Sequence, residues 1–123
     1  MLNQGKVFAT LAVSDINKAK EFYGTTLGLS QVDENPGGVT YESGGGRLFV
    51  YQSPTAGTNQ ATCASWQVDD IRSAVDDLKG KGISFEHYEV PGATMDGDIH
   101  VMGDMKASWF KDPDGNILNV AQA

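Results

Sequence analysis

The side chains best suited to acid–base or metal chemistry lie in one polar stretch of the last third of the chain. His87 and His100 are the only histidines, and Asp98 stands two residues before His100. On an extended segment Asp98 and His100 would project to the same side, since side chains alternate along a strand. With Asp96 nearby, such a pair suits metal binding or general acid–base catalysis. We favour a polar loop for this segment and, for His87 beside Glu86, a solvated strand face.

Two further polar residues fall on predicted strands. Cys63 is the only cysteine, so the chain can form no internal disulfide and a reducing compartment is expected. A nucleophilic role for Cys63 would require a base and a lowered pKa, and a small residue buried in a central strand is the favoured interpretation. Asn119 interrupts an apolar run between Leu118 and Val120.

The strand that carries Asn119 follows the clearest turn signal in the chain. Pro113 presets φ for a tight turn, and Gly115 supplies the positive φ that a chain reversal needs. The Asp112 side chain can accept a hydrogen bond from the backbone two residues on. Apolar and aromatic residues flank the turn on both sides, which predicts a β-hairpin over residues 106–121.

The first half of the chain reads as βαβββ. Ser14 and Asp15 are good helix N-caps, and Ile16, Ala19 and Phe22 then recur at helical spacing. Glycine-rich turns separate the runs that follow. We expect strands over 6–13, 29–33, 39–43 and 47–52, and one helix from residue 16 to about 27.

The second half repeats this order. Val13 and Asp15 correspond to Val68 and Asp70, each 55 positions later, and a unit of this size cannot close a core alone. We expect strands over 61–68, 83–88, 106–111 and 117–121, a helix from residue 71, a loop over 91–97, and either strand or loop over 99–102. The α+β domain then spans 1–123, with halves over about 5–53 and 61–122 and a linker over 54–60.

Bulk composition narrows the function classes. The chain has 123 residues, 40% of them hydrophobic, with a formal charge of -7, which fits one globular domain. The negative charge argues against nucleic acid or an anionic membrane as partner, and would weakly favour a cationic ligand. No leader segment and no membrane-spanning run are expected, so we predict a cytoplasmic protein.

Motifs in both halves resemble one family, the vicinal oxygen chelate superfamily of glyoxalases, bleomycin-resistance proteins and ring-cleaving dioxygenases. The resemblance implies two tandem βαβββ units that form a curled, cup-like mixed sheet of eight strands with the helices outside. It also implies a homodimer with pockets inside the cups. The segments that carry it are Leu11-Ala12-Val13-Ser14-Asp15, Glu21-Phe22-Tyr23, Leu27-Gly28-Leu29 and Phe110-Lys111-Asp112-Pro113-Asp114-Gly115-Asn116.

Enzymes of this family usually bind a divalent metal through four side chains on the first and last strands of each half. The corresponding positions here are Phe8, Val50 or Tyr51, Cys63, and Asn119. Phenylalanine has no donor atom, and a neutral asparagine binds hard cations weakly. A catalytic divalent site needs about three protein ligands and an open position, so we expect no metal and no other cofactor.

Aromatic residues on the predicted strands point instead to an apolar pocket. Phe8 takes an inward position by the resemblance, and strand alternation turns either Trp109 or Phe110 inward, but not both. Trp66 has the opposite parity to Cys63 and is expected under a helix. A pocket of aromatic walls with few polar anchors suits a planar or amphipathic small molecule. The candidate ligand-binding residues are Phe8, Tyr41, Phe49, Tyr51, Cys63, Trp109 and Asn119.

Three functions remain open at this level. The first is a metal-independent binder that sequesters a drug or metabolite, similar to antibiotic-resistance proteins of the superfamily. The second is a metal-dependent lyase, isomerase or dioxygenase-like enzyme with displaced ligands at His100, Asp98 and Cys63. The third is an interaction module whose cup is filled by side chains. One scaffold can host many chemistries, so the sequence names neither the ligand nor the way in which the halves pair.

Overall fold

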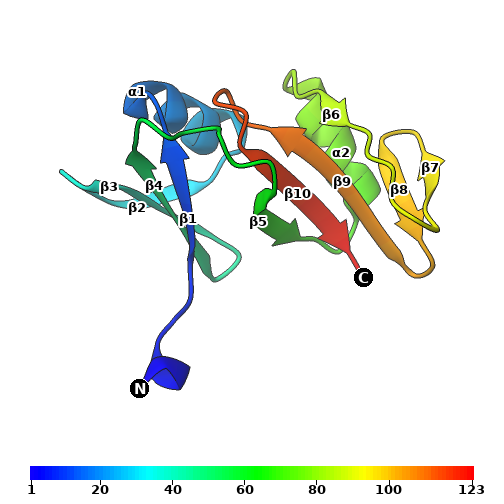
Figure 1. Cartoon of the computed structure of the whole chain (residues 1–123), viewed down its shortest axis with the longest axis horizontal. Helices are drawn as coiled ribbons and strands as arrows, with labels where there is room; N and C mark the ends of the chain where they lie inside the picture. Colours follow the sequence, from blue (N-terminus) through cyan, green and yellow to red (C-terminus); the bar gives the residue numbers. More distant parts are fainter. The chain divides into compact units, whose positions relative to one another are not determined.

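The structure is a computed structural model that describes residues 1–123. One order of strands and helices is repeated along the chain. Two units follow each other, Met1–Thr58 and Asn59–Ala123. Each unit has one helical segment packed on a mixed sheet (Figure 1). The predicted α+β class with two βαβββ-type units is therefore confirmed.

The sheet of unit 1 has the strand order β1-β4-β3-β2. β1 and β4 are parallel, whereas the other neighbours are antiparallel. The first strand is shorter than predicted, because residues 6–8 lead into it without pairing. The elements are η1 (Leu2–Gln4), β1 (Ala9–Val13), α1 (Ile16–Ala19), η2 (Lys20–Thr26), β2 (Ser30–Asn35), β3 (Gly38–Ser43) and β4 (Gly46–Gln52).

The helical segment of unit 1 begins at the predicted cap. The Asp15 carboxylate accepts hydrogen bonds from the backbone N–H groups of Asn17 and Lys18, which satisfies donors that a helix start leaves unpaired. The α-helix then widens into the π-helical segment η2, where the Leu27 N–H reaches the Phe22 carbonyl at 2.8 Å. This segment turns Phe22 and Tyr23 onto the sheet.

Alternation along the strands of unit 1 gives the sheet one covered face. Leu11, Val13, Leu48 and Val50 are at most 5% exposed, and the register joins Leu11 to Val50 across the β1–β4 ladder. These side chains face the helical segment and form the core of the unit. The residues between them therefore occupy the opposite face, which we call the helix-free face.

Unit 2 has a sheet of six strands, in the order β5-β10-β9-β8-β7 with β6 also paired to β9. As in unit 1, the first and last strands of the unit, β5 and β10, are parallel. The elements are β5 (Thr62–Gln67), α2 (Ile71–Gly80), β6 (Phe85–Glu86), β7 (Thr94–Asp96), β8 (Ile99–Met102), β9 (Met105–Lys111) and β10 (Ile117–Gln122).

Two sequence predictions for unit 2 need correction. The loop predicted over 91–97 contains the strand β7, which pairs with β8. The strand predicted over 83–88 is reduced to Phe85–Glu86, since only these two residues pair with β9. The ambiguous segment 99–102 is the strand β8, paired on both sides. Tertiary pairing decides such short segments, because their own sequence preferences are weak.

The closing hairpin is built as predicted. Gly115 has φ 91°, and its N–H donates to the Asp112 carbonyl at 3.0 Å. The Asp112 carboxylate accepts the N–H of Asp114 two residues on, as expected, and also the N–H and side-chain amide of Asn116, all within 2.9 Å. These bonds fix the register in which Asn119 lies opposite Trp109.

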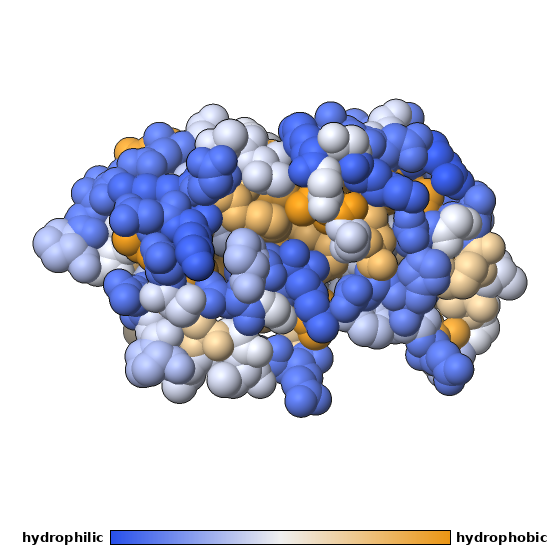
Figure 2. Space-filling model, turned by 90° about the horizontal axis from the view of Figure 1, so that it is seen from above, coloured by the Kyte–Doolittle hydropathy of each residue, from blue (hydrophilic) through white to orange (hydrophobic).

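Hydrophilic side chains cover most of the face shown in Figure 2, with hydrophobic residues visible between them. None of the helices combines the length and the hydrophobicity that a membrane-spanning helix requires.

Candidate binding site

Aromatic side chains gather on the helix-free face of unit 1. Phe49 and Tyr51 alternate with the buried Leu48 and Val50 on β4, and their rings stack at 6.2 Å with an interplanar angle of 9°. Phe8 shares this parity and remains 55% exposed. Three of the candidate ligand-binding residues, Phe8, Phe49 and Tyr51, therefore lie on one face of unit 1, and their role in binding stays a prediction.

A pocket of about 400 Å³ opens on this same face. Phe8, Phe49 and Thr40 line it together with two cationic residues, Lys6 and Arg47. Thr40 lies directly across the ladder from Phe49. The sequence reasoning missed Lys6 and Arg47, although each stands two residues before a selected phenylalanine, which is the spacing that brings side chains to one face of a strand.

Tyr41 does not lie with these residues. It pairs with Leu48 on the covered face, is 1% exposed, and its ring lies 6.3 Å from that of Tyr23. Burial, and to a lesser extent the Glu34 carboxylate, raises the pKa of its hydroxyl. The structure therefore assigns Tyr41 to the core of unit 1, and the expectation that it anchors a pocket does not fit its position.

In unit 2 the face of β9 and β10 opposite the buried Phe110 and Leu118, which we also call helix-free, centres on Trp109. Phe110 and Leu118 are buried, so the alternative between Trp109 and Phe110 is resolved in favour of Trp109. The Tyr88 ring packs edge-on against the Trp109 ring at 5.6 Å. The indole N–H donates to the Thr62 hydroxyl at 3.1 Å, which fixes the orientation of the ring.

Asn119 and Cys63 lie on neighbouring strands of this sheet. Asn119 faces the same side as Trp109 and is 7% exposed, and its amide N–H donates to the Ser108 carbonyl at 3.2 Å. Cys63 has no partner in the β5–β10 ladder, where the register shifts. Its thiol lies 3.6 Å from the Ala61 carbonyl oxygen. Cys63 is only partly buried, and β5 stands at the end of the strand order of its sheet, so the favoured interpretation of a residue buried in a central strand is wrong.

His100 is a structural residue of unit 2, contrary to the predicted polar loop. It is fully buried on β8. Nε2 lies 3.0 Å from the backbone N and 3.2 Å from the carbonyl oxygen of Tyr88, and Nδ1 lies 3.2 Å from the Ala107 carbonyl oxygen. Both ring nitrogens are thereby used, and the ring packs against Trp109 at 4.8 Å.

Asp98 contacts Lys79 and His87 rather than His100. Its carboxylate lies 2.7 Å from both Lys79 Nζ and His87 Nε2. These hydrogen bonds, that of Lys79 first, hold the pKa of Asp98 below its ordinary value of 3.8. The cluster connects Lys79 on α2 to Asp98, which directly precedes β8. The His87 side chain remains about half exposed.

Replacing Asp98 by asparagine should lower stability at neutral pH by about 1 kcal/mol, since the partners are partly exposed. A depressed pKa contributes stability above the unfolded value, and this is lost as the pH falls through the folded pKa. As the pH falls below about 4, the free energy of unfolding should therefore decrease less in Asp98→Asn than in the unsubstituted protein. Urea unfolding at several pH values measures both effects. Identical acid profiles for the two proteins would contradict them.

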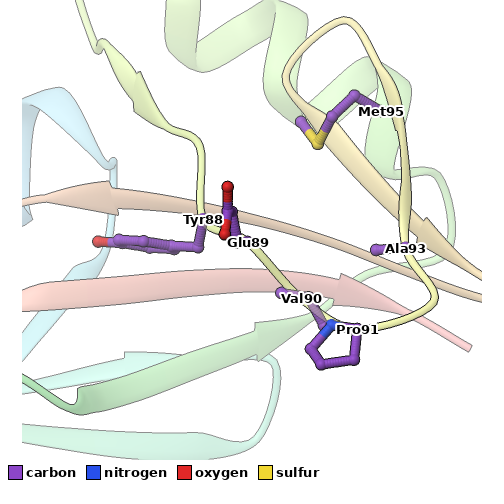
Figure 3. A pocket seen from close by; sticks show the side chains of 6 residues that line it. All are labelled: Tyr88, Glu89, Val90, Pro91, Ala93 and Met95. Atoms are coloured by element: carbon purple, nitrogen blue, oxygen red, sulfur yellow. The ribbon is translucent and has the colours of Figure 1, made fainter.

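A second pocket, of about 470 Å³, follows the connection from β6 to β7. Figure 3 shows Tyr88, Pro91 and Met95 pointing in different directions around it. No histidine or cysteine lines it, and Glu89 is its only charged residue. Because its side chains do not converge, we assign no chemistry to this pocket.

Comparison with known proteins decides the family. The family model described as Glyoxalase/Bleomycin resistance protein/Dioxygenase superfamily matches residues 7–120. The chain belongs to this superfamily. A search of the curated proteins finds no match.

Several solved structures share the fold. TnmS3, an antibiotic binding protein from Streptomyces sp. CB03234, is 23% identical with TM-score 0.72, over 96% of this chain and 94% of that one. FosX, a fosfomycin resistance protein from Listeria monocytogenes, is 14% identical with TM-score 0.72, over 97% and 93%. A glyoxalase family protein from Enterococcus faecalis is 20% identical with TM-score 0.71, over 98% and 99%. At these identities the likeness shows the fold alone.

The four positions at which glyoxalase-type enzymes hold a metal do not fit one here. Phe8 has no donor atom, Val50 is buried on the covered face, and the Tyr51 ring stacks on Phe49. Cys63 and Asn119 remain, which is fewer than the three ligands that a catalytic divalent site needs. No group of three His, Cys, Asp or Glu side chains that could hold a metal comes together elsewhere.

Proposed function

We propose that this protein binds a small molecule with a planar apolar part and sequesters it, as a drug- or metabolite-binding member of the glyoxalase/bleomycin-resistance type. The observation that carries this proposal is the set of aromatic rings on the helix-free face of unit 1. Phe49 and Tyr51 form a stacked pair, and Phe8 beside them is 55% exposed. Exposed aromatic surface beside a pocket is typical of small-molecule sites.

Trp109 supports the same function in unit 2. Its ring is held by Thr62 and flanked by Tyr88, so it offers a rigid surface for stacking at little cost in side-chain entropy. Binding in this proposal uses stacking and a few polar groups, and it does not use a metal. We further propose that the protein acts as a cytoplasmic homodimer, as the family resemblance implies.

A panel of planar antibiotics and metabolites tests the proposal through the melting temperature. A ligand present at ten times its Kd raises the free energy of unfolding by about 1.4 kcal/mol. For a chain of this size, Tm then rises by about 5 °C. Failure of every compound in a broad panel to raise Tm would remove the support for a binding function.

Substitution of the two tryptophans then tests the role of unit 2. Trp109→Phe should weaken a planar ligand about 3- to 10-fold, because the larger stacking surface is lost. Trp66 pairs with the buried Val120 on the covered side of the sheet, so Trp66→Phe is the matched control and should leave the affinity unchanged. Titration calorimetry measures both variants. Equal affinities would exclude Trp109 from the site.

A further inference from the structure

The pocket on the helix-free face of unit 1 combines two aromatic rings with two cations. Phe8 and Phe49 form its apolar lining, and Lys6 and Arg47 lie at the same pocket. We propose that this pocket binds a planar aromatic molecule that carries a carboxylate or phosphate group. The inference rests on the proposed binding function and goes further, since it assigns the charge of the ligand and the residues that recognise it.

The two cations of the pocket lack close carboxylate partners. Five of the nine lysines and arginines lie within 3.2 Å of a carboxylate. Lys6 has no ion pair in the structure, and Arg47 lies 3.9 Å from Glu42, with both side chains about half exposed. An exposed pair at that distance contributes little, so Arg47 can turn to a ligand at small cost.

Lys18 and Lys106 also lack an ion pair, so what distinguishes Lys6 and Arg47 is that they lie at one pocket beside two aromatic rings, in a protein of formal charge -7. A cation without a close partner beside two phenylalanine rings therefore suggests a ligand of negative charge. The Glu42 carboxylate lies across the β3–β4 ladder from Arg47, so an anionic ligand has to compete with this weak, exposed pair. More distant exposed carboxylates are screened over about 8 Å at physiological ionic strength. The net charge of the chain weakly favours a cationic ligand. At this pocket the two local cations favour an anion instead.

Each part of such a ligand has a counterpart in the pocket. The guanidinium of Arg47 can donate two parallel hydrogen bonds to a carboxylate or phosphate, and Lys6 adds a second positive charge. The rings of Phe8 and Phe49 offer surfaces for an aromatic ring, while the Thr40 hydroxyl can donate or accept one more bond. The volume of about 400 Å³ lies within the range of small-molecule sites.

Four naphthalene probes of similar size test the charge preference: 2-naphthoate, 2-naphthyl phosphate, neutral 2-naphthalenemethanol and cationic 2-naphthylmethylamine. Titration calorimetry gives the affinities, and NMR of the Phe8, Arg47 and Phe49 amides locates the bound probe. We expect both anions to bind about tenfold more tightly than the neutral probe. The cation should bind most weakly, and added salt should reduce only the affinity of the anions.

Variants assign the preference to this pocket. Arg47→Gln should lower the affinity for the anions about tenfold and leave the neutral probe unchanged, while Arg47→Lys should restore part of the loss. Arg72→Gln is the matched control, because it removes an exposed arginine from α2 in unit 2. Melting temperatures establish that all three variants are folded.

The outcomes separate this inference from the binding function. If the neutral probe binds as tightly as the anions, or if Arg47→Gln behaves as Arg72→Gln, the inference is overturned. Binding of the neutral probe that is weakened by Phe49→Leu would then still support the binding function. If no probe binds, the anion site is overturned, and the antibiotic and metabolite panel decides the binding function separately.

Discussion

Replacing Asp112 by alanine should destabilise the protein by about 3 kcal/mol, because donors in the closing hairpin lose a charged acceptor. The Asp112 side chain is nearly buried, at 5% exposure. It accepts two backbone N–H groups and the Asn116 amide, all within 2.9 Å. Alanine leaves these donors without that acceptor in a poorly solvated turn. Urea unfolding should show the loss directly, and Tm should fall by about 10 °C.

Two variants of the same turn show whether the carboxylate is the cause. Asp112→Asn keeps one oxygen for the backbone N–H groups but turns an amide toward the Asn116 amide, so we expect an intermediate loss of about 1.5 kcal/mol. Asp114→Ala removes a less buried carboxylate two residues away and should cost less than either. An Asp112→Ala protein as stable as Asp114→Ala would show that the hairpin does not depend on this network.

Replacing Tyr41 by alanine should cost about 3–5 kcal/mol, the usual loss for a large aromatic residue in a core. Tyr41 is fully covered and packs beside Tyr23, so its removal leaves a cavity under the helical segment of unit 1. The expected loss approaches the whole stability of a typical small domain. Thermal unfolding followed by circular dichroism measures it.

Tyr51→Ala provides the control, because it removes the same side chain from the opposite face of the same sheet. Tyr51 is only partly buried and stacks on Phe49, so its loss should cost about 1 kcal/mol and weaken ligand binding in unit 1. Tyr41→Phe keeps the ring in the core and should leave ligand affinity unchanged. Equal destabilisation by Tyr41→Ala and Tyr51→Ala would contradict the assignment of these two residues to opposite faces.

Both comparisons separate residues that hold the fold from residues that face a ligand. The turn at Asp112 fixes the strand on which Asn119 lies, and Tyr41 supports the sheet that presents Phe49. Tyr41 faces the core of unit 1 and does not line the proposed pocket. Loss of binding in their variants would therefore follow loss of folding, whereas loss of binding in Arg47 or Trp109 variants should occur in a folded protein.

Local signals in the sequence were sufficient for the repeated fold and for the hairpin. Asp15 and Asp70 both cap helices as predicted, because a side-chain cap acts on backbone groups only two or three residues away. Alternation along β9 separated Trp109 from Phe110, as predicted. Such patterns depend on the period of a single strand, which the sequence contains in full.

The face on which Tyr41 lies was decided by the pairing of strands. In β3, Thr40 and Tyr41 could each have faced a pocket, and the register with Leu48 and the ring of Tyr23 selected the core for Tyr41. A shift by one residue would exchange the two faces. The sequence of β3 alone contains no information on which register its neighbours impose.

The burial of His100 and the assembly of the pocket of unit 1 likewise depend on tertiary structure. His100 is buried because the Tyr88 N–H and the Ala107 carbonyl, 12 and 7 positions away, satisfy both of its ring nitrogens. Lys6 and Arg47 meet at one pocket although 41 positions separate them in the sequence. The sequence by itself determined the repeated units, their caps and the closing hairpin, since these depend on neighbours in the chain. The sites depend on strand pairing between distant residues, which only the folded chain provides.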